Sequence, residues 1–87
     1  MDFTWLFAQM TKNGYFYFSG NTNQKGDLSI YFSKLAGDRG DSVEIEIDKN
    51  NKYWLDIDTN NMIGISSYNN LTEEQFISIL TNEVFQK

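Results

Sequence analysis

The stretch that decides the fold runs from Ser42 to Asp58 and reads SVEIEIDKNNKYWLDID. Apolar and polar residues alternate on both sides of the central KNNK, and this period of two is typical of strands with one buried face. A three-residue loop over 49–51 keeps the apolar residues of both strands on one face, whereas a two-residue loop would turn one set outward. Asn51 can supply the left-handed conformation that such a loop needs. The sequence therefore predicts a hairpin in which Glu44 lies opposite Asp56 and Glu46 opposite Trp54.

The next turn follows the same logic. Residues 58–62 again offer a three-residue loop, 59–61, that ends in asparagine. This loop would pair Ile57 with Ile63 and Leu55 with Ile65, apolar to apolar. Together the two turns predict a three-stranded meander over residues 42–67.

The two ends of the chain are predicted to be amphipathic helices. Apolar residues recur with a helical period between Phe3 and Met10, Asp2 can cap the start, and Asn13-Gly14 can end the helix. Near the other end, Thr72–Gln75 has the pattern of a capping box, and apolar residues continue with a helical period from Phe76 to Val84.

Residues 15–35 complete the pattern. Residues 15–19 are predicted to be an aromatic strand, and 21–26 a loop. Residues 27–33 also alternate, which puts Leu28, Ile30 and Phe32 on the buried face. A helix that begins after Asp27 and ends at Gly37 is the competing interpretation. We favour the strand because isoleucine, tyrosine and phenylalanine between serines are poor helix formers.

The predicted fold class is therefore α+β. The order is α-β-β-β-β-β-α, with a five-stranded antiparallel meander sheet and the N- and C-terminal helices on one face. At 87 residues the chain is expected to form a single two-layer domain over 1–87.

The composition argues against most enzyme chemistries. The chain has no cysteine and no histidine, so it lacks a thiol nucleophile, the commonest general base and the commonest metal ligands. No serine or threonine has a histidine to activate it. We therefore expect no enzyme activity, no catalytic residue, no cofactor and no metal site.

The charge argues against two further classes of partner. A net charge of −5 disfavours direct nucleic-acid binding and attachment to an anionic membrane. The chain has no apolar run long enough for a membrane-spanning helix, and its first residues do not resemble a secretory signal. We expect a cytoplasmic location, in a bacterial cell or a phage-infected host.

Most of the negative charge falls on the predicted hairpin. Residues 41–58 contain six acidic residues and two lysines, a net charge of −4, whereas residues 1–40 carry +1. If the helices cover the odd-numbered face, the other face displays the polar residues of the hairpin. Those candidate partner-binding residues are Glu44, Glu46, Asp48, Trp54, Asp56 and Asp58.

Two interpretations of this face stay open. One is a solvated sheet surface with acidic edge protection. The other is a docking face for a basic partner, with Trp54 as an aromatic anchor and the carboxylates steering encounter. A catalytic pair of Glu44 and Asp56 is disfavoured, because so small a chain offers little cleft for a sugar substrate. Three tyrosines are predicted to extend the face, or else to be ordinary strand residues: Tyr15, Tyr17 and Tyr31.

At the level of class, this small, acidic, cysteine-free and asparagine-rich chain resembles toxin-immunity proteins and phage inhibitors of bacterial defence, including anti-CRISPR proteins. The resemblance implies a protein-binding inhibitor that blocks a basic partner that handles nucleic acid, such as a nuclease, a toxin or a defence complex. The alternative is a structural or assembly subunit that forms a homo-oligomer, such as a homodimer, through its tyrosine-rich face or an edge strand.

Overall fold

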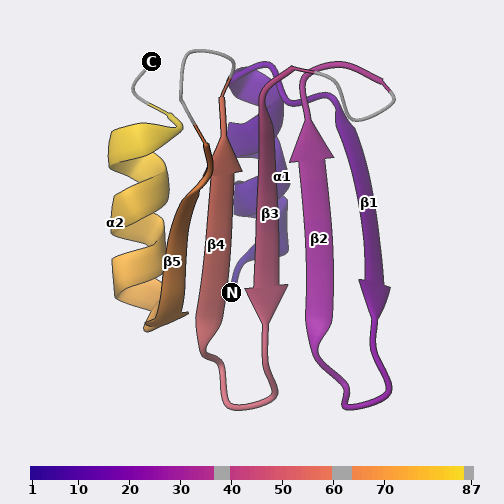
Figure 1. The fold of residues 1–87 in the computed structure, drawn as a ribbon, viewed down its shortest axis with the longest axis vertical. Helices are drawn as coiled ribbons and strands as arrows, with labels where there is room; N and C mark the ends of the chain where they lie inside the picture. The colour runs from indigo at the N-terminus through magenta and orange to yellow at the C-terminus, as the bar shows by residue number, and fades with distance from the viewer. Residues whose placement is uncertain (37–39, 60–63, 86–87) are drawn as a thin grey trace.

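The computed structural model describes residues 1–36, 40–59 and 64–85. It contains seven elements, which Figure 1 labels. In chain order they are α1 (Phe3–Lys12), β1 (Tyr17–Thr22), β2 (Leu28–Ser33), β3 (Ser42–Ile47), β4 (Tyr53–Asp58), β5 (Ser66–Leu71) and α2 (Glu73–Glu83).

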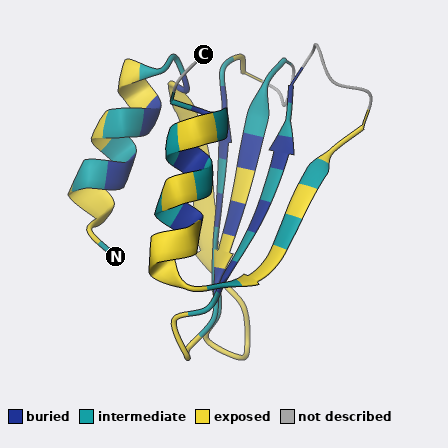
Figure 2. Ribbon diagram, turned by 90° about the vertical axis from the view of Figure 1, so that its left-hand side faces the viewer, coloured by how far each residue is buried: buried dark blue, intermediate teal, exposed yellow. Residues whose placement is uncertain are grey.

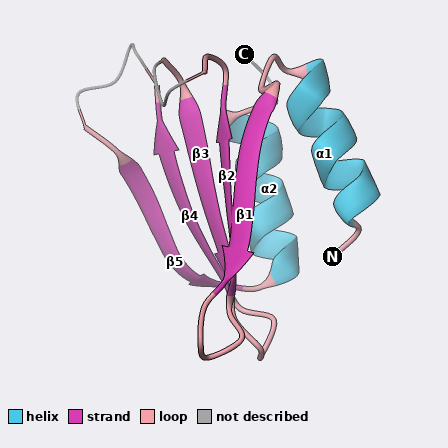
Figure 3. Ribbon diagram, turned by 90° about the vertical axis from the view of Figure 1, so that its right-hand side faces the viewer, coloured by secondary structure: helices cyan, strands magenta, loops and turns pink. Residues whose placement is uncertain are grey.

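The five strands form one antiparallel sheet in the order β1-β2-β3-β4-β5, so each strand pairs with its neighbour in sequence. Both helices lie on the same side of the sheet, and no described helix covers the other side (Figures 2 and 3). This arrangement confirms the predicted α+β meander with two helices on one face.

The core lies between the sheet and the two helices. The apolar residues of β3 and β4 alternate with polar ones and point toward the helices, as the period of two requires. Each helix contributes one apolar stripe. The fully buried side chains at the centre are Leu6, Met10, Phe32, Val43, Ile45, Tyr53, Leu55, Ile57, Phe76 and Leu80.

Both helices begin at the predicted caps. The Asp2 carboxylate accepts a hydrogen bond from the backbone N–H of Trp5 at 3.1 Å. In α2 the Thr72 hydroxyl accepts from the N–H of Gln75, and the Gln75 side chain accepts from the N–H of Thr72, which completes the capping box. The helix α1 ends at Asn13, and Gly14 then takes the left-handed conformation with φ of 93°.

The hairpin of β3 and β4 has the predicted register. Glu44 pairs with Asp56, and Glu46 pairs with Trp54. Asn51 closes the three-residue loop with φ of 59°, and its N–H donates to the carbonyl of Asp48 at 3.0 Å. The alternation and the turn residue therefore specified this hairpin together.

The segment 28–33 is the predicted strand and not the competing helix, with Ile30 and Phe32 buried. The first strand differs from the prediction, because β1 begins at Tyr17 and extends to Thr22. Its turn is a short one, in which Gly26 takes a φ of 88° and donates to the Asn23 carbonyl. The predicted loop 21–26 was therefore too long, since the turn needs only three residues.

The predicted pairing of the last strand was wrong. Residues 60–63 lie outside the described part of the chain, as does most of the predicted loop 59–61. In the structure β5 begins at Ser66, Leu55 pairs with Tyr68, and Ile65 is 59% exposed. A bulge opposite Trp54 puts Tyr68 and Leu71 on the helix side. There the Tyr68 hydroxyl donates a hydrogen bond to Glu83 of α2, a contact that no strand pattern encodes.

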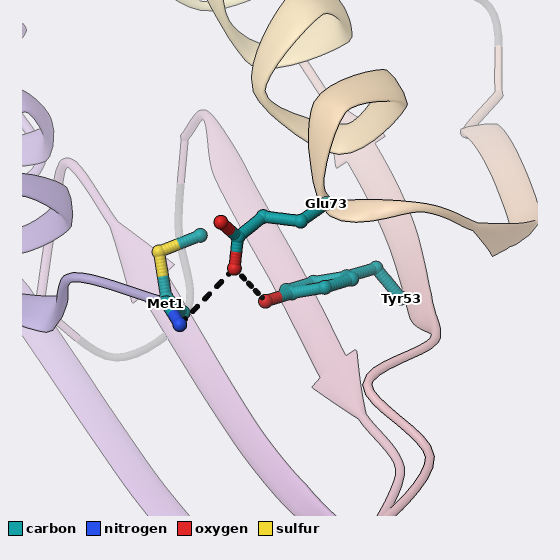
Figure 4. Close-up of polar contacts among 3 residues, drawn as sticks. All are labelled: Met1, Tyr53 and Glu73. Atoms are coloured by element: carbon teal, nitrogen blue, oxygen red, sulfur yellow. Dashed lines mark hydrogen bonds and ion pairs between the residues drawn. The ribbon is translucent and has the colours of Figure 1, made fainter.

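A polar contact joins both helix starts to the sheet (Figure 4). Oε1 of Glu73 accepts a hydrogen bond from the Tyr53 hydroxyl at 2.8 Å and lies 3.0 Å from the α-amino group of Met1. The hydrogen bond from Tyr53, followed by that from the Met1 amine, lowers the pKa of Glu73. Burial, and then the bond to Glu73, raise the pKa of Tyr53 to about 12. This contact therefore ties α1, α2 and β4 together.

Candidate protein-binding surface

The uncovered side of the sheet carries the predicted acidic residues. We call this surface the acidic face and define it by the side chains of Glu44, Glu46, Asp48, Trp54, Asp56 and Asp58. All six alternate with buried apolar neighbours on β3, on β4 or at their connecting turn, so they point away from the helices. The structure thus brings the six hairpin residues to one side of the sheet.

The charges of the acidic face are stacked across the strands. The turn closes with a hydrogen bond from the Asp48 N–H to the Lys52 carbonyl at 3.0 Å. Backbone-bonded and non-bonded positions alternate along an antiparallel ladder, so the backbones of Glu44 and Asp56, two such steps from the turn, also hydrogen-bond to one another. At such positions the opposed Cα atoms lie about 5.5 Å apart. The row containing this pair crosses the whole sheet, and its members are Ser19, Tyr31, Glu44, Asp56 and Ser67.

Two further rows flank this one. On the side of the β3–β4 turn, Glu46 lies between Ser29 and Trp54. On the opposite side, Ser42 lies between Ser33 and Asp58. The four carboxylates on the strands therefore occupy three successive rows, and Trp54 stands in one of them.

Four of these carboxylates have no partner among the described residues. The side chains of Glu44, Glu46, Asp56 and Asp58 make no hydrogen bond or ion pair within 1–36, 40–59 and 64–85. Glu44 and Glu46 are exposed, and the other two are half-buried. Because no described cation forms an ion pair with them, their fields add on the open side of the sheet.

Asp48 differs from the others because the turn already uses its carboxylate. Oδ1 of Asp48 accepts hydrogen bonds from the N–H of Asn50 at 2.8 Å and of Lys52 at 2.9 Å. This Asx-turn geometry fixes the hairpin loop. Asp48 adds negative charge to the surface, but its first role is structural.

A hollow of about 450 Å³ opens beside Trp54. It lies between the β1–β2 turn, which contributes Lys25 and Asp27, and the β3–β4 turn, which contributes Asp48 and Lys49. Glu46 and Trp54, which lie opposite one another on β3 and β4, also line it. Lys25 and Asp27 are not among the predicted residues of this surface. The sheet order places them there, because it brings both turns to the same end of the sheet (Figure 1).

Tyr15 does not belong to this surface, contrary to the prediction. It precedes β1, it is only 4% exposed, and its N–H donates to the Met10 carbonyl at the end of α1. The Lys34 ammonium lies 5.2 Å from the centre of its ring. Burial, and then the negative charge of Asp41, raise the pKa of Tyr15 to about 12. The backbone hydrogen bond at the end of α1 therefore holds Tyr15 where its ring is buried in the core.

The other two tyrosines do reach the open side of the sheet. Tyr31 lies directly beside Glu44, and Ser19 lies on its other side. Tyr17 pairs with Ser33 and is exposed at the edge. The aromatic part of the surface therefore consists of Tyr17, Tyr31 and Trp54.

Comparison of the chain with models of known protein families, with curated proteins and with solved structures finds no match. In the part of the chain that the structure describes, no three acidic side chains come together in a group that could hold a metal ion. Neither described helix combines the length and apolar character needed to cross a bilayer.

Proposed function

We propose that the protein is a stoichiometric inhibitor that binds a basic protein partner through the acidic face. The partner is a protein that handles nucleic acid, such as a nuclease, a toxin or a defence complex, and the setting is the cytoplasm of a bacterial cell or a phage-infected host. Anti-defence and toxin immunity both fit this chemistry. The inhibitor acts by occupying the partner's basic groove, without chemistry of its own.

The observation that carries the proposal is the unpartnered pair of Glu44 and Asp56. Like charges directly opposite one another destabilise a sheet. Neither carboxylate has a described partner that would offset this cost. A basic surface placed over the pair would relieve the repulsion and add charge-assisted hydrogen bonds.

The neighbouring residues fit the same role. Trp54 offers an aromatic surface of the kind that anchors protein interfaces. The hollow of about 450 Å³ beside it has room for a long side chain. Three acids and two lysines line it, so its lining is negative by one charge: Asp27, Glu46, Asp48, Lys25 and Lys49. The net charge of −4 on residues 41–58 would steer a basic partner toward this side of the sheet.

The test begins with affinity capture from the source cell and from its phage-infected counterpart. Association of the captured partner is then measured for the wild-type chain and for Glu44→Lys/Asp56→Lys. A control variant carries four exposed neutral-to-lysine changes on the helices. Both variants have a net charge of −5 + 4 = −1. The control changes are Thr4→Lys, Ala8→Lys, Ser78→Lys and Asn82→Lys.

We expect the double reversal to slow association by at least tenfold at low salt, and the control to slow it much less. Nucleic acid should compete with the wild-type chain for the partner. Equal affinity of the wild-type chain and the folded double reversal would show that another surface binds. If association slowed equally in both variants, the net charge of the chain, and not the acidic face, would account for the effect.

A further inference from the structure

The strand β1 forms one edge of the sheet, and no other described strand pairs with its outer side (Figure 3). Its turn closes with a hydrogen bond from the Asn23 N–H to the Asp27 carbonyl. From there, the odd-numbered residues of β1 bond to β2, and the even-numbered residues direct their N–H and C=O groups outward. Phe18, Gly20 and Thr22 therefore present backbone groups along this edge that have no hydrogen-bond partner among the described residues.

This edge carries none of the features that block strand addition. Residues 13–24 contain no charged residue and no proline, and β1 pairs with β2 without a bulge. All six residues of β1 are exposed, unlike those of any other strand in the described chain. At the opposite edge, β5 has a bulge, with Asn70 at φ of 56°. Edge pairing is thus favoured at β1.

An apolar groove of about 320 Å³ runs along the helix side of this edge. Phe3 and Phe7 of α1 form one wall, and Phe18 and Gly20 of β1 lie on the other. The Phe18 ring packs edge-on against Phe7, with centroids 4.8 Å apart, yet 63% of Phe18 stays exposed. Gly20 has no side chain, so the groove is open toward the free edge at that residue.

We propose that two copies of the chain pair antiparallel through β1, with the two-fold axis at Ser19. In this register Phe18 of each copy lies opposite Gly20 of the other, on the helix side. The exposed Phe18 ring of each copy then lies over Gly20 of the other copy, where there is no side chain, and enters that copy's apolar groove. The chain thus supplies both halves of the contact, which is the self-complementarity that an isologous dimer requires.

Charge also favours a second copy as the occupant. Each copy carries a net charge of −5, but residues 13–24 are uncharged and residues 1–40 sum to +1. Two copies therefore meet along β1 without opposing like charges. The acidic hairpin lies beyond β2, on strands three and four of the sheet.

The dimer has a consequence for any partner. A two-fold axis perpendicular to the sheet joins the two sheets into one of ten strands and places both acidic faces on the same side. Two linked faces would bind a partner with two basic sites more tightly than one face does. The dimer itself does not depend on the proposed inhibitory function.

Sedimentation equilibrium across a concentration series tests the proposal. We expect a wild-type mass of 2 × 10.1 = 20.2 kDa at high concentration. Ser19→Lys puts two lysines opposite one another at the axis and should raise the dimer dissociation constant about two- to fivefold. Ser67→Lys is the control, since it adds the same charge at the far end of the same row.

A wild-type chain that remains a monomer at about 1 mM would overturn the proposal. So would a dimer that both lysine variants weaken equally, or that neither weakens. Circular dichroism establishes that each variant is folded.

A cysteine variant tests the register itself. The chain has no cysteine, so Ser19→Cys introduces one thiol per copy. Ser19 would face its own copy in a non-hydrogen-bonded pair, where Cα atoms lie about 4.5 Å apart, within the range of a disulfide. Mild oxidation should give a covalent dimer from Ser19→Cys and much less from Ser67→Cys. Equal yields would contradict the register.

Discussion

Replacing Asp56 with asparagine should make the protein more stable. Asp56 lies directly opposite Glu44, and neither carboxylate contacts a described cation or hydrogen-bond donor. Asparagine keeps the shape of the side chain and removes its charge. The change therefore isolates the electrostatic cost that the acidic face imposes on the free protein.

The size of the effect follows from the geometry of the pair. Two unit charges about 6 Å apart in water repel by about 0.7 kcal/mol. Screening over a Debye length of about 8 Å reduces this to about 0.3 kcal/mol at physiological salt, and to about 0.1 kcal/mol at 1 M. At low salt the gain corresponds to a rise of about 3–5 °C in Tm for a chain of this size.

The assay is urea unfolding of a double-mutant cycle. Wild type, Glu44→Gln, Asp56→Asn and the double variant are compared at about 10 mM and 1 M salt. The cycle removes changes in strand propensity and leaves the interaction between the two carboxylates. We expect a repulsive coupling that salt abolishes.

A loss of more than about 1 kcal/mol in Asp56→Asn, unchanged by salt, would contradict a repulsive pair of carboxylates. Such a loss is the size expected for a satisfied hydrogen bond to a charged group. It would mean that the fold itself uses the carboxylate, and that the acidic face is structural.

Changes at four further positions test the helix side of the fold. Thr72→Ala removes the hydroxyl of the capping box and should lower the free energy of unfolding by about 1 kcal/mol in urea, and Thr72→Ser should restore most of it. Leu80→Ala empties a fully buried site and should cost about 2–5 kcal/mol; a loss below about 1 kcal/mol would contradict the described core. The raised pKa of Tyr53, about 12 against an ordinary 10, means that its neutral form stabilises the fold below pH 10 and that this contribution is lost as the pH rises from 10 to 12. Tyr53→Phe should therefore show a smaller alkaline loss of stability than wild type, and an identical loss would refute the assignment. The pKa of Glu73 is lowered, so its ionised form stabilises the fold above its ordinary pKa, and this stabilisation is lost as the pH falls through the pKa of the folded state. Glu73→Gln should therefore lose less stability in acid than wild type, and an identical loss would contradict this role of Glu73.

The central hairpin was predictable because two independent signals agree on it. Alternation alone allows more than one register, but only a three-residue loop keeps both apolar sets on one face. Asn51 then supplies the left-handed residue that this loop requires. The opposition of Glu44 and Asp56 follows directly from that register.

The pairing of β5 was not predictable from local pattern, because the apolar residues closest to the turn are not those that pair. The predicted loop pairs Ile65 with Leu55, whereas in the structure Ile65 is exposed and Leu55 pairs with Tyr68. The bulge beside Tyr68 and the contact between Tyr68 and Glu83 depend on where α2 packs. Such a contact joins residues 15 positions apart and leaves no periodic signal in the sequence.

Tyr15 illustrates a second limit. Its neighbours have strand-forming side chains, so the pattern favours a strand that begins there. The backbone bond from its N–H to Met10 instead makes it part of the α1 ending, and its ring is buried. The position of a strand's first residue is decided by the preceding helix, which alternation does not encode.

Backbone NMR of the labelled chain, with and without the captured partner, shows whether the acidic face contacts that partner. We expect the shifts and line broadening to centre on Glu44, Glu46, Trp54 and Asp56, with the indole N–H of Trp54 among the strongest. Perturbations centred on the exposed sides of α1 and α2, with the hairpin unchanged, would show that the partner does not bind the acidic face.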